Sequence, residues 1–195
     1  MLLTVPVARM CAAVLAVGLF LTACGEADSE VESASFSIEG SEAFMSGVID
    51  GSTPDEVSAL LVDYPDVDTI VMLDVPGSDN DAANLEASRL IRDAGIATHV
   101  PADGQIASGG VDFFLAGETR TYDSGATFSV HSWAAGDGLT GADLLRDDPE
   151  HDLYLDYYEA MGIDEDFYWF TLEAAPADSF HDMTEAELET FNFQT

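Results

Sequence analysis

A serine followed by two glycines, and a histidine further along the chain, are the residues whose types and spacing best suit chemistry. The serine lies in residues 104–110, which read Gly-Gln-Ile-Ala-Ser-Gly-Gly, and the histidine is His131. A serine hydroxyl is a poor nucleophile until a base takes its proton, and histidine is the usual base at neutral pH. Glycine after the serine lets backbone N–H groups approach a developing oxyanion. The pattern therefore indicates attack on a carbonyl by Ser108, with His131 as the general base.

A second turn upstream repeats this arrangement. Residues 76–78, Pro-Gly-Ser, break a β-rich run in the same way as the turn at Ser108. This turn is therefore expected to present a second backbone N–H toward the same point. Two such donors would form an oxyanion hole.

The segments that position these residues alternate between strand-like and helix-like patterns, which predicts an α/β fold. The run at 69–73 predicts a buried parallel strand. A strand at 127–130 is expected to end at His131, while Ser108 follows a strand and opens a helix, whose N-terminus favours negative charge. The other expected elements are strands at 35–38, 44–49 and 97–100, a helix capped by Thr53 and running to about Asp63, a helix from Asp81 to Ala94, and a buried helix at 111–116.

Beyond Gly136 the pattern becomes helical. One helix is expected to end at Gly162, and Asp164 is expected to cap the next. Thr184 and Glu187 form a capping box for a short C-terminal helix. The apolar face of the first of these helices is expected to consist of Leu153, Tyr154, Tyr157 and Met161.

Residues 1–24 have the features of a targeting segment. Arg9 is the only charged residue among them, an apolar run follows it, and the segment closes on Leu-Thr-Ala-Cys at Cys24. This ending resembles the bacterial lipobox, whose cysteine becomes the acylated first residue of the mature protein. An ordinary secretory signal or a short membrane anchor is the alternative, although the run is short beside the roughly 20 apolar residues of a transmembrane helix.

These features predict an extracytoplasmic protein, lipid-anchored through Cys24 to the cell membrane or outer membrane and placed in the periplasm or on the cell surface. The small, acidic residues 25–34 then read as a flexible tether, and residues 35–195 as one domain. Since the other cysteine, Cys11, lies in the targeting segment, no disulfide is expected within the mature chain.

The charge of the chain is strongly one-sided. There are 38 acidic residues against 5 basic ones, for a formal net charge of −33, and every basic residue is arginine. Such self-repulsion destabilises a compact state in dilute buffer and is screened in salt, where the Debye length is about 3 Å at 1 M. The balance predicts adaptation to a saline environment, with an ordinary acidic exported protein as the alternative. It disfavours nucleic acid as a partner, because phosphate binding needs a basic surface.

Metal and cofactor sites are not expected. No cluster of His and Cys has the spacing of a zinc site. Two acidic runs, 79–81 and 164–166, do not fit the twelve-residue calcium loop and are better explained as helix caps.

Several segments together resemble a known superfamily. Residues 71–78, 91–95 and 104–131 are similar to the Clp protease catalytic subunit and signal peptide peptidase A relatives, and most of all to their exported bacterial branch, described as predicted periplasmic ClpP-like proteins. Weaker similarity at 157–164 and 183–188 extends the resemblance over about residues 35–195. It implies a ClpP/crotonase-like α/β fold, with a mostly parallel sheet, flanking helices and a helical C-terminal segment.

The resemblance also implies roles for the residues already singled out. It implies peptide hydrolysis with Ser108 as nucleophile, His131 as base and the N–H of Gly109 as one oxyanion donor. Ser78 stands where the family has the second glycine of Ser-Pro-Gly-Gly, so its N–H would be the other donor, without the conformational freedom of glycine. Family members commonly form rings or face-to-face assemblies, which implies a homo-oligomer.

The third member of a catalytic triad is less clearly marked. The family's aspartate falls near Phe180, which cannot orient an imidazole, and Asp178 and Asp182 flank it. Asp178 is the favoured residue, while a Ser/His dyad or a degenerate site stays open.

The sequence therefore predicts an exported serine hydrolase acting on a peptide or a small ester or amide, with no metal and no organic cofactor. A non-catalytic module that binds a peptide or partner protein in the same cleft is the alternative. An acidic lipoprotein with a purely structural role in the envelope is the third reading.

Overall fold

The computed structural model describes residues 32–135 and 138–195, which belong to one compact unit. The predicted signal segment, Cys24 and most of the predicted tether lie outside the described residues. Residues 32–34, at the end of that tether, already pair with the domain. The Ala34 N–H donates to the Val48 carbonyl at 2.7 Å, and the Val48 N–H donates to the Glu32 carbonyl at 2.9 Å. The backbone pairing of the domain thus begins before the predicted boundary at Ser35.

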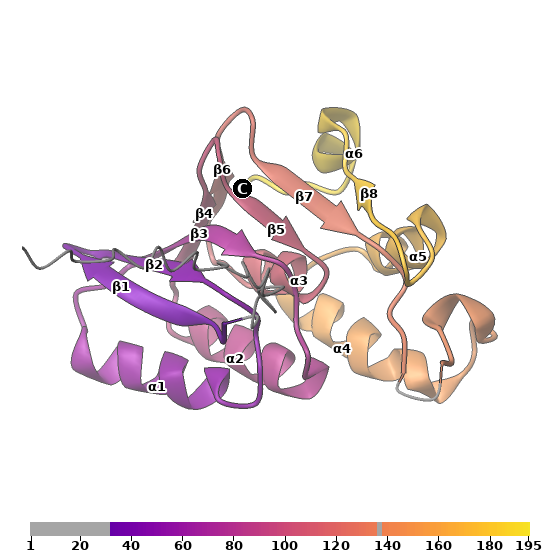
Figure 1. The fold of residues 1–195 in the computed structure, drawn as a ribbon, viewed down its shortest axis with the longest axis horizontal. Helices are drawn as coiled ribbons and strands as arrows, with labels where there is room; N and C mark the ends of the chain where they lie inside the picture. The colour runs from indigo at the N-terminus through magenta and orange to yellow at the C-terminus, as the bar shows by residue number, and fades with distance from the viewer. Residues whose placement is uncertain (1–31, 136–137) are drawn as a thin grey trace, which may run out of the picture. The chain divides into compact units, whose positions relative to one another are not determined.

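Eight strands in the described part of the chain form one mostly parallel sheet (Figure 1). Its main path runs β1-β2-β3-β5-β7-β8, while β4 pairs with β3 and β6. The β1–β2 and β7–β8 pairs are antiparallel. The strands are β1 (Ser35–Glu39), β2 (Glu42–Ser46), β3 (Thr69–Val75), β4 (Ala97–Val100), β5 (Gln105–Ala107), β6 (Arg120–Tyr122), β7 (Thr127–Val130) and β8 (His181–Asp182).

Strand β3 has two sets of neighbours, and this decides where the site lies. Its first residues, Thr69–Val71, pair with β4, whereas Asp74 and Val75 pair with β5. Strand β5 pairs in turn with β7. The carboxyl ends of β3, β5 and β7 therefore meet at one edge of the sheet, which is where ligands bind in open parallel sheets.

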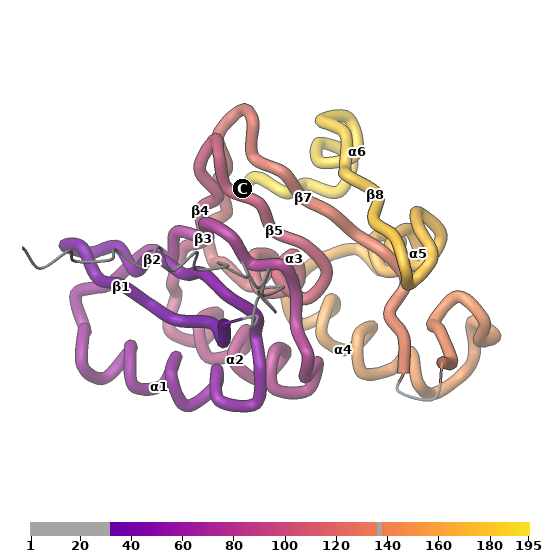
Figure 2. Tube along the Cα trace, viewed as in Figure 1, coloured from indigo at the N-terminus to yellow at the C-terminus, as the bar shows by residue number. Residues whose placement is uncertain are grey.

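Helices α1 and α2 pack against each other on one side of the sheet (Figure 1), and α4 continues along the same side in the trace (Figure 2). The short helix α3 follows β5, while α5 and α6 lie near β8. The helices are α1 (Thr53–Asp63), α2 (Asp81–Asp93), α3 (Gly109–Leu115), α4 (Asp152–Met161), α5 (Glu165–Ala174) and α6 (Glu185–Thr190), with 3₁₀ turns at Gly141–Asp143 and Pro149–His151.

Aromatic rings fill much of the core. Phe114, Phe128 and Phe193 contact one another with ring centroids 5.0, 5.3 and 5.9 Å apart. The buried Arg120 guanidinium donates to the carbonyl oxygens of Phe193 and Asn192 at 3.2 and 3.1 Å. The end of the chain is thereby held against β6, because a buried cation needs such acceptors.

The predicted α/β class, mostly parallel sheet and flanking helices are confirmed, and so are the caps of the last two helices. Asp164 accepts a hydrogen bond from the Asp166 N–H, and Thr184 and Glu187 form the predicted capping box. At α1 the N-cap is Ser52 rather than Thr53, which is the first helical residue.

Two other features differ from the predictions. The sequence pattern does not predict β6 and β8, which have three and two residues and are too short for a visible alternation. Leu153 is 46% exposed, so the buried face of α4 is formed by its tyrosines and Met161.

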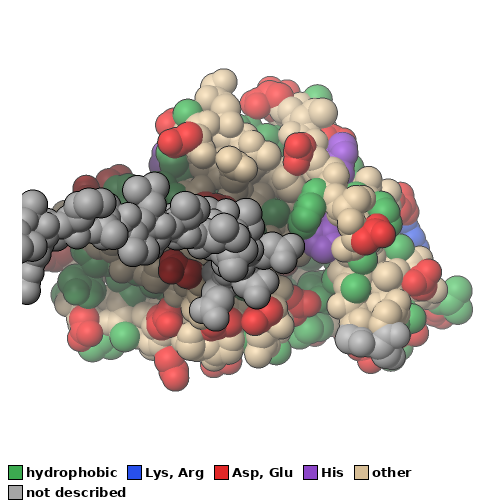
Figure 3. Space-filling model, in the orientation of Figure 1, with side chains coloured by type: hydrophobic (Ala, Val, Ile, Leu, Met, Phe, Trp, Pro, Cys, Tyr) green, Lys and Arg blue, Asp and Glu red, His purple; other side chains and the backbone are tan. Residues whose placement is uncertain are grey.

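Acidic side chains are spread over the visible face of the molecule rather than gathered in one patch (Figure 3). Among the basic residues, Arg92 and Arg120 donate to backbone carbonyls. Most of the described Asp and Glu side chains are exposed, so the excess negative charge lies mostly at the surface, where dissolved salt can screen it.

Candidate active site

Ser108 occupies a strained turn between β5 and α3. Its φ is 51° and its ψ is −126°, and among the described non-glycine residues only Ser108 and Asn192 have positive φ. Such a conformation costs an L-residue about 1–3 kcal/mol and persists only where the surrounding structure imposes it. Here the Ser108 N–H donates to the Ser129 carbonyl at 2.9 Å, and the Ser108 carbonyl accepts from the Val111 N–H at 2.8 Å. A strand-to-helix turn of this kind raises a serine hydroxyl above the sheet edge.

Glycines on both sides of this turn allow the close packing that holds it. A Cβ on Gly77, whose φ is +142°, would meet the Ser108 Cβ at 3.2 Å. A Cβ on Gly109 would lie 2.3 Å from the Ser78 Oγ, and one on Gly110 would lie 2.5 Å from the Val75 carbonyl oxygen. The start of α3 therefore rests directly on the turn after β3.

Two backbone N–H groups at this contact are free to bind a substrate oxygen. Ile49 pairs with the turn through its N–H to the Gly77 carbonyl and its carbonyl to the Asp79 N–H, both 2.9 Å, which leaves the Ser78 N–H on the other side. Within the described residues, neither the Ser78 nor the Gly109 N–H donates a hydrogen bond. Ser78 does not have a positive φ, so a serine occupies this turn without the strain that a positive φ would impose. This arrangement suits the predicted oxyanion hole.

His131 follows β7, which lies parallel to β5 with Ala107 opposite Ser129. Ser108 and His131 therefore leave the sheet at the same edge, and both line one cavity of about 190 Å³ together with Ser78 and Gly109. No hydrogen bond joins Ser108 to His131 in the described structure. Catalytic hydrogen bonds are often long without substrate and tighten when it binds.

The imidazole of His131 is partly buried. Its Nδ1 is buried and has no hydrogen-bond partner among the described residues, and its ring meets that of Phe180 edge-on at 4.7 Å between centroids. Burial lowers the pKa of His131, opposed by the backbone of Ser132, the charge of Asp81 and the backbone of Ala177. A lowered pKa keeps the ring neutral, which is the form that accepts a proton.

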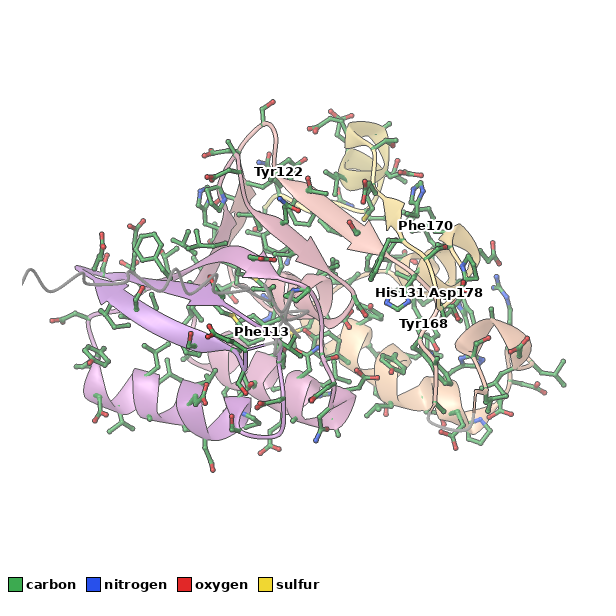
Figure 4. All side chains as sticks on the ribbon, in the orientation of Figure 1. Phe113, Tyr122, His131, Tyr168, Phe170 and Asp178 are labelled. Atoms are coloured by element: carbon green, nitrogen blue, oxygen red, sulfur yellow. The ribbon has the colours of Figure 1, made fainter. Side chains whose placement is uncertain are left out.

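No hydrogen bond or ion pair joins Asp178, the favoured third triad residue, to His131 in the described structure. The β7–β8 pairing sets Val130 opposite His181, and the Ser132 N–H donates to the Ala175 carbonyl at 2.9 Å, so this segment runs beside the histidine. Asp178 is exposed, and the Phe180 ring packs edge-on against the imidazole. Figure 4 shows His131 and Asp178 in the same region of the view.

The other flanking acid is also engaged elsewhere. Asp182 Oδ1 accepts a 2.6 Å hydrogen bond from the Ser129 hydroxyl. Of the predicted site residues, Ser78, Ser108, Gly109 and His131 are thus brought together, and no described carboxylate orients the histidine.

Two carboxylates that the sequence analysis passes over line the same cavity. Asp81, at the start of α2, accepts from the Ser78 hydroxyl at 2.6 Å and from the Tyr154 hydroxyl at 2.5 Å. Asp112 lies one helical turn after Ser108 and accepts from the Tyr158 hydroxyl at 2.5 Å. The sequence could have revealed Asp112 only by its spacing. It stands four residues after Ser108, which places the two on the same face of a helix.

Burial raises the pKa of Asp112 to about 7, with a further rise from the charge of Asp81 and an opposing effect of the Tyr158 hydrogen bond. The two carboxylates therefore act on each other inside one cavity.

Residues 32–135 and 138–195 hold no group of three or more His, Cys, Asp or Glu side chains placed to bind a metal ion. The same residues contain no helix with the length and apolar character needed to cross a bilayer.

No protein-family model matches the sequence, and no curated protein matches it. Similar solved structures include two of the 1510-N membrane-bound stomatin-specific protease, one of them with a substrate peptide, each with 14% identity and a TM-score of 0.49. Both matches cover 75% of this chain, and they cover 71% and 75% of the protease chains. An enoyl-CoA hydratase from Polaromonas sp. JS666 matches 50% of this chain and 51% of its own, with 13% identity and a TM-score of 0.39. All three matches have TM-scores below 0.5 and identities of 14% or less.

Proposed function

We propose that this protein is a serine hydrolase of peptides or of small esters or amides. The observation that carries the proposal is the strained φ of 51° at Ser108, in the lining of a cavity that His131 also lines. Glycine would occupy that turn without strain, so a serine there indicates that its hydroxyl is used.

The chemistry follows from the positions of the groups. Ser108 Oγ attacks the carbonyl carbon while His131 takes the hydroxyl proton, and the N–H groups of Ser78 and Gly109 receive the negative oxygen. His131 then gives the proton to the leaving group. A water molecule, deprotonated by the same ring, releases the acyl group from Ser108.

The missing carboxylate sets the expected rate. Because Nδ1 is the buried nitrogen, we assign proton transfer to Nε2, with the ring hydrogen on Nδ1. No described carboxylate accepts that hydrogen. Loss of the acid lowers kcat about 10⁴-fold in a complete triad, so this site is expected to be slow.

A serine-directed fluorophosphonate probe tests the proposal. In 1 M salt the full chain should be labelled once, and Ser108→Ala should lose the label because the probe reacts only with an activated hydroxyl. Ser41→Ala is the matched control, since Ser41 is exposed in a turn and does not line the cavity. Equal labelling of wild type and Ser108→Ala would refute a nucleophilic role for this serine.

The pH dependence should show the depressed pKa of His131. For a neutral ester, the acidic limb of kcat/KM should have its midpoint below about 6.5, because only the neutral ring acts as base. Asp81→Asn should move the midpoint lower still, since the charge of Asp81 raises this pKa. Asp93→Asn removes the same charge on the exposed end of α2 and should leave the midpoint in place. A midpoint above the ordinary histidine range contradicts the base we assign.

Binding without catalysis is the second candidate function. The lack of a Ser108–His131 hydrogen bond and the unpartnered Nδ1 favour it. In that case the cavity holds a peptide or partner protein, and the probe labels nothing.

We also propose that the protein is exported, anchored by lipid on Cys24, adapted to salt and assembled as a homo-oligomer. The lipobox and the net charge of −33 support the first three of these, and the family resemblance supports the fourth. Loss of the membrane-bound fraction in Cys24→Ser would test the anchor.

Stability should rise with salt. Screening shortens the Debye length from about 10 Å at 0.1 M to about 3 Å at 1 M, which weakens the repulsion among the surface carboxylates. The midpoint temperature of thermal unfolding should therefore be higher in about 1 M NaCl than in about 0.1 M NaCl. An unchanged or lower midpoint would remove the case for saline adaptation.

A further inference from the structure

We propose that the cavity beside Ser108 selects a substrate residue with a cationic side chain, lysine or arginine, through the carboxylates of Asp81 and Asp112. The inference rests on the proposed function and names its substrate class. The cationic residue is the one whose carbonyl Ser108 attacks, because Ser108 and Gly109 line the same cavity as the two acids.

Asp81 is held in place for such a role. Its two oxygens accept from Ser78 and Tyr154, so the carboxylate cannot rotate freely. Each carboxylate oxygen has two lone pairs, and one on each remains for a ligand. The serine that replaces the family's glycine at Ser78 therefore has a second task, which is to fix this acid.

Asp112 offers a second acceptor. Its Oδ1 accepts a hydrogen bond from the Tyr158 hydroxyl, and no described residue donates to its Oδ2. The Oδ2 atom is not fully enclosed. That oxygen is reachable from the cavity that Asp112 lines.

Without a ligand, no cation pairs with the acids of the cavity. Asp81 and Asp112 line it, and no lysine or arginine of the described chain does. The raised pKa of Asp112, about 7, means that this acid is partly protonated near neutral pH, and a bound cation would favour its charged form. Arg89, which lies over the Tyr157 ring at 5.3 Å, is not part of the lining. Acids in such places are normally paired, and a cation supplied by the substrate completes the pair.

The other walls suit the same ligand. Trp133 and Tyr154 are stacked with centroids 5.8 Å apart, and Tyr154 and Tyr168 with centroids 5.5 Å apart. Aromatic faces attract cations, and the aliphatic stem of lysine or arginine packs along them. A neutral apolar side chain would fill the same space but leave both acids without a partner.

Binding can be tested apart from hydrolysis. Two blocked tripeptide amides, Ala-Ala-Lys and Ala-Ala-norleucine, differ in charge at nearly equal shape. Calorimetric titration of the full-length Ser108→Ala protein in 1 M salt should show the lysine peptide binding at least about tenfold more tightly, as expected for hydrogen bonds to charged groups.

Single variants locate the preference. In the Ser108→Ala protein, Asp81→Asn and Asp112→Asn should each reduce the lysine preference about tenfold. Asp93→Asn, which removes one exposed carboxylate of α2 outside the cavity, should leave it unchanged. The comparison of the two peptides on one protein needs neither acid variant, so it holds even if a variant fails to fold.

The outcomes separate this inference from the proposed function. Equal binding, tighter binding of norleucine, or no binding of either peptide would overturn the cation pocket. The wild-type protein is then assayed with matched lysine and norleucine esters. Lysine-selective binding without hydrolysis of either ester would overturn the hydrolase and leave the pocket standing.

Discussion

Replacing Ser108 with glycine is expected to abolish hydrolysis and to stabilise the fold at the same time. The hydroxyl is the proposed nucleophile, so kcat should fall at least about 10³-fold. Glycine adopts a φ of 51° without steric conflict, so the strain of about 1–3 kcal/mol is relieved, less the entropy that glycine loses on folding. Initial rates with an activated ester and denaturant unfolding, both in molar salt, measure the two effects.

Two variants make this prediction specific. Ser108→Ala removes the hydroxyl but keeps a Cβ, so it should lose the activity without gaining stability. Asn192→Gly introduces glycine at the other positive φ, 53°, where asparagine is already tolerated, and should gain less. A Ser108→Gly protein less stable than wild type would show that the turn is not strained.

Replacing Gly109 with alanine is expected to have the second largest effect. The new Cβ would lie 2.3 Å from the Ser78 Oγ, 2.7 Å from its Cβ and 2.9 Å from the Asn84 Nδ2, so the turn after β3 or the start of α3 must move. Because both oxyanion donors sit at this contact, kcat should fall at least about 10²-fold. Overpacking should also cost about 1–3 kcal/mol of stability.

Gly51→Ala is the control for the added methyl group. Gly51 has an ordinary φ, and a Cβ there would have its nearest contact at 3.5 Å, with the Asn80 Nδ2. That variant should keep the wild-type rate and stability to within about 0.5 kcal/mol. Wild-type activity in Gly109→Ala would exclude the oxyanion hole that we assign.

The parts of the site predicted from the sequence are those that depend on neighbouring residues. The glycine turn at Ser108, the strand that ends at His131 and the caps at Asp164 and Thr184 are each marked within a few positions. Strand alternation and capping are local properties, so their sequence patterns are readable without the fold.

The third acid could not be predicted in this way. Counting residues from His131 places the family's aspartate near Phe180, but the count cannot say which side chain of that loop turns inward. The pairing of Val130 with His181 decides it, and it sets Phe180 on the imidazole while Asp178 faces outward.

The acids of the cavity show the same limit. Asp81 reads as the first residue of a helix, and Asp112 as one polar residue in a buried helix. Their partners, Tyr154 and Tyr158, come from α4, far along the chain. Only the packing of α4 against α2 and α3 reveals that the two acids share one space.

The reactive residues, the α/β class and the excess of negative charge are therefore readable from the chain of amino acids. The strain at Ser108, the contact of Phe180 with His131 and the joining of Asp81 and Asp112 in one cavity were decided by tertiary structure. The physical reason is that the first set arises from chain neighbours and composition, whereas the second arises from contacts between strands and helices that only folding brings together.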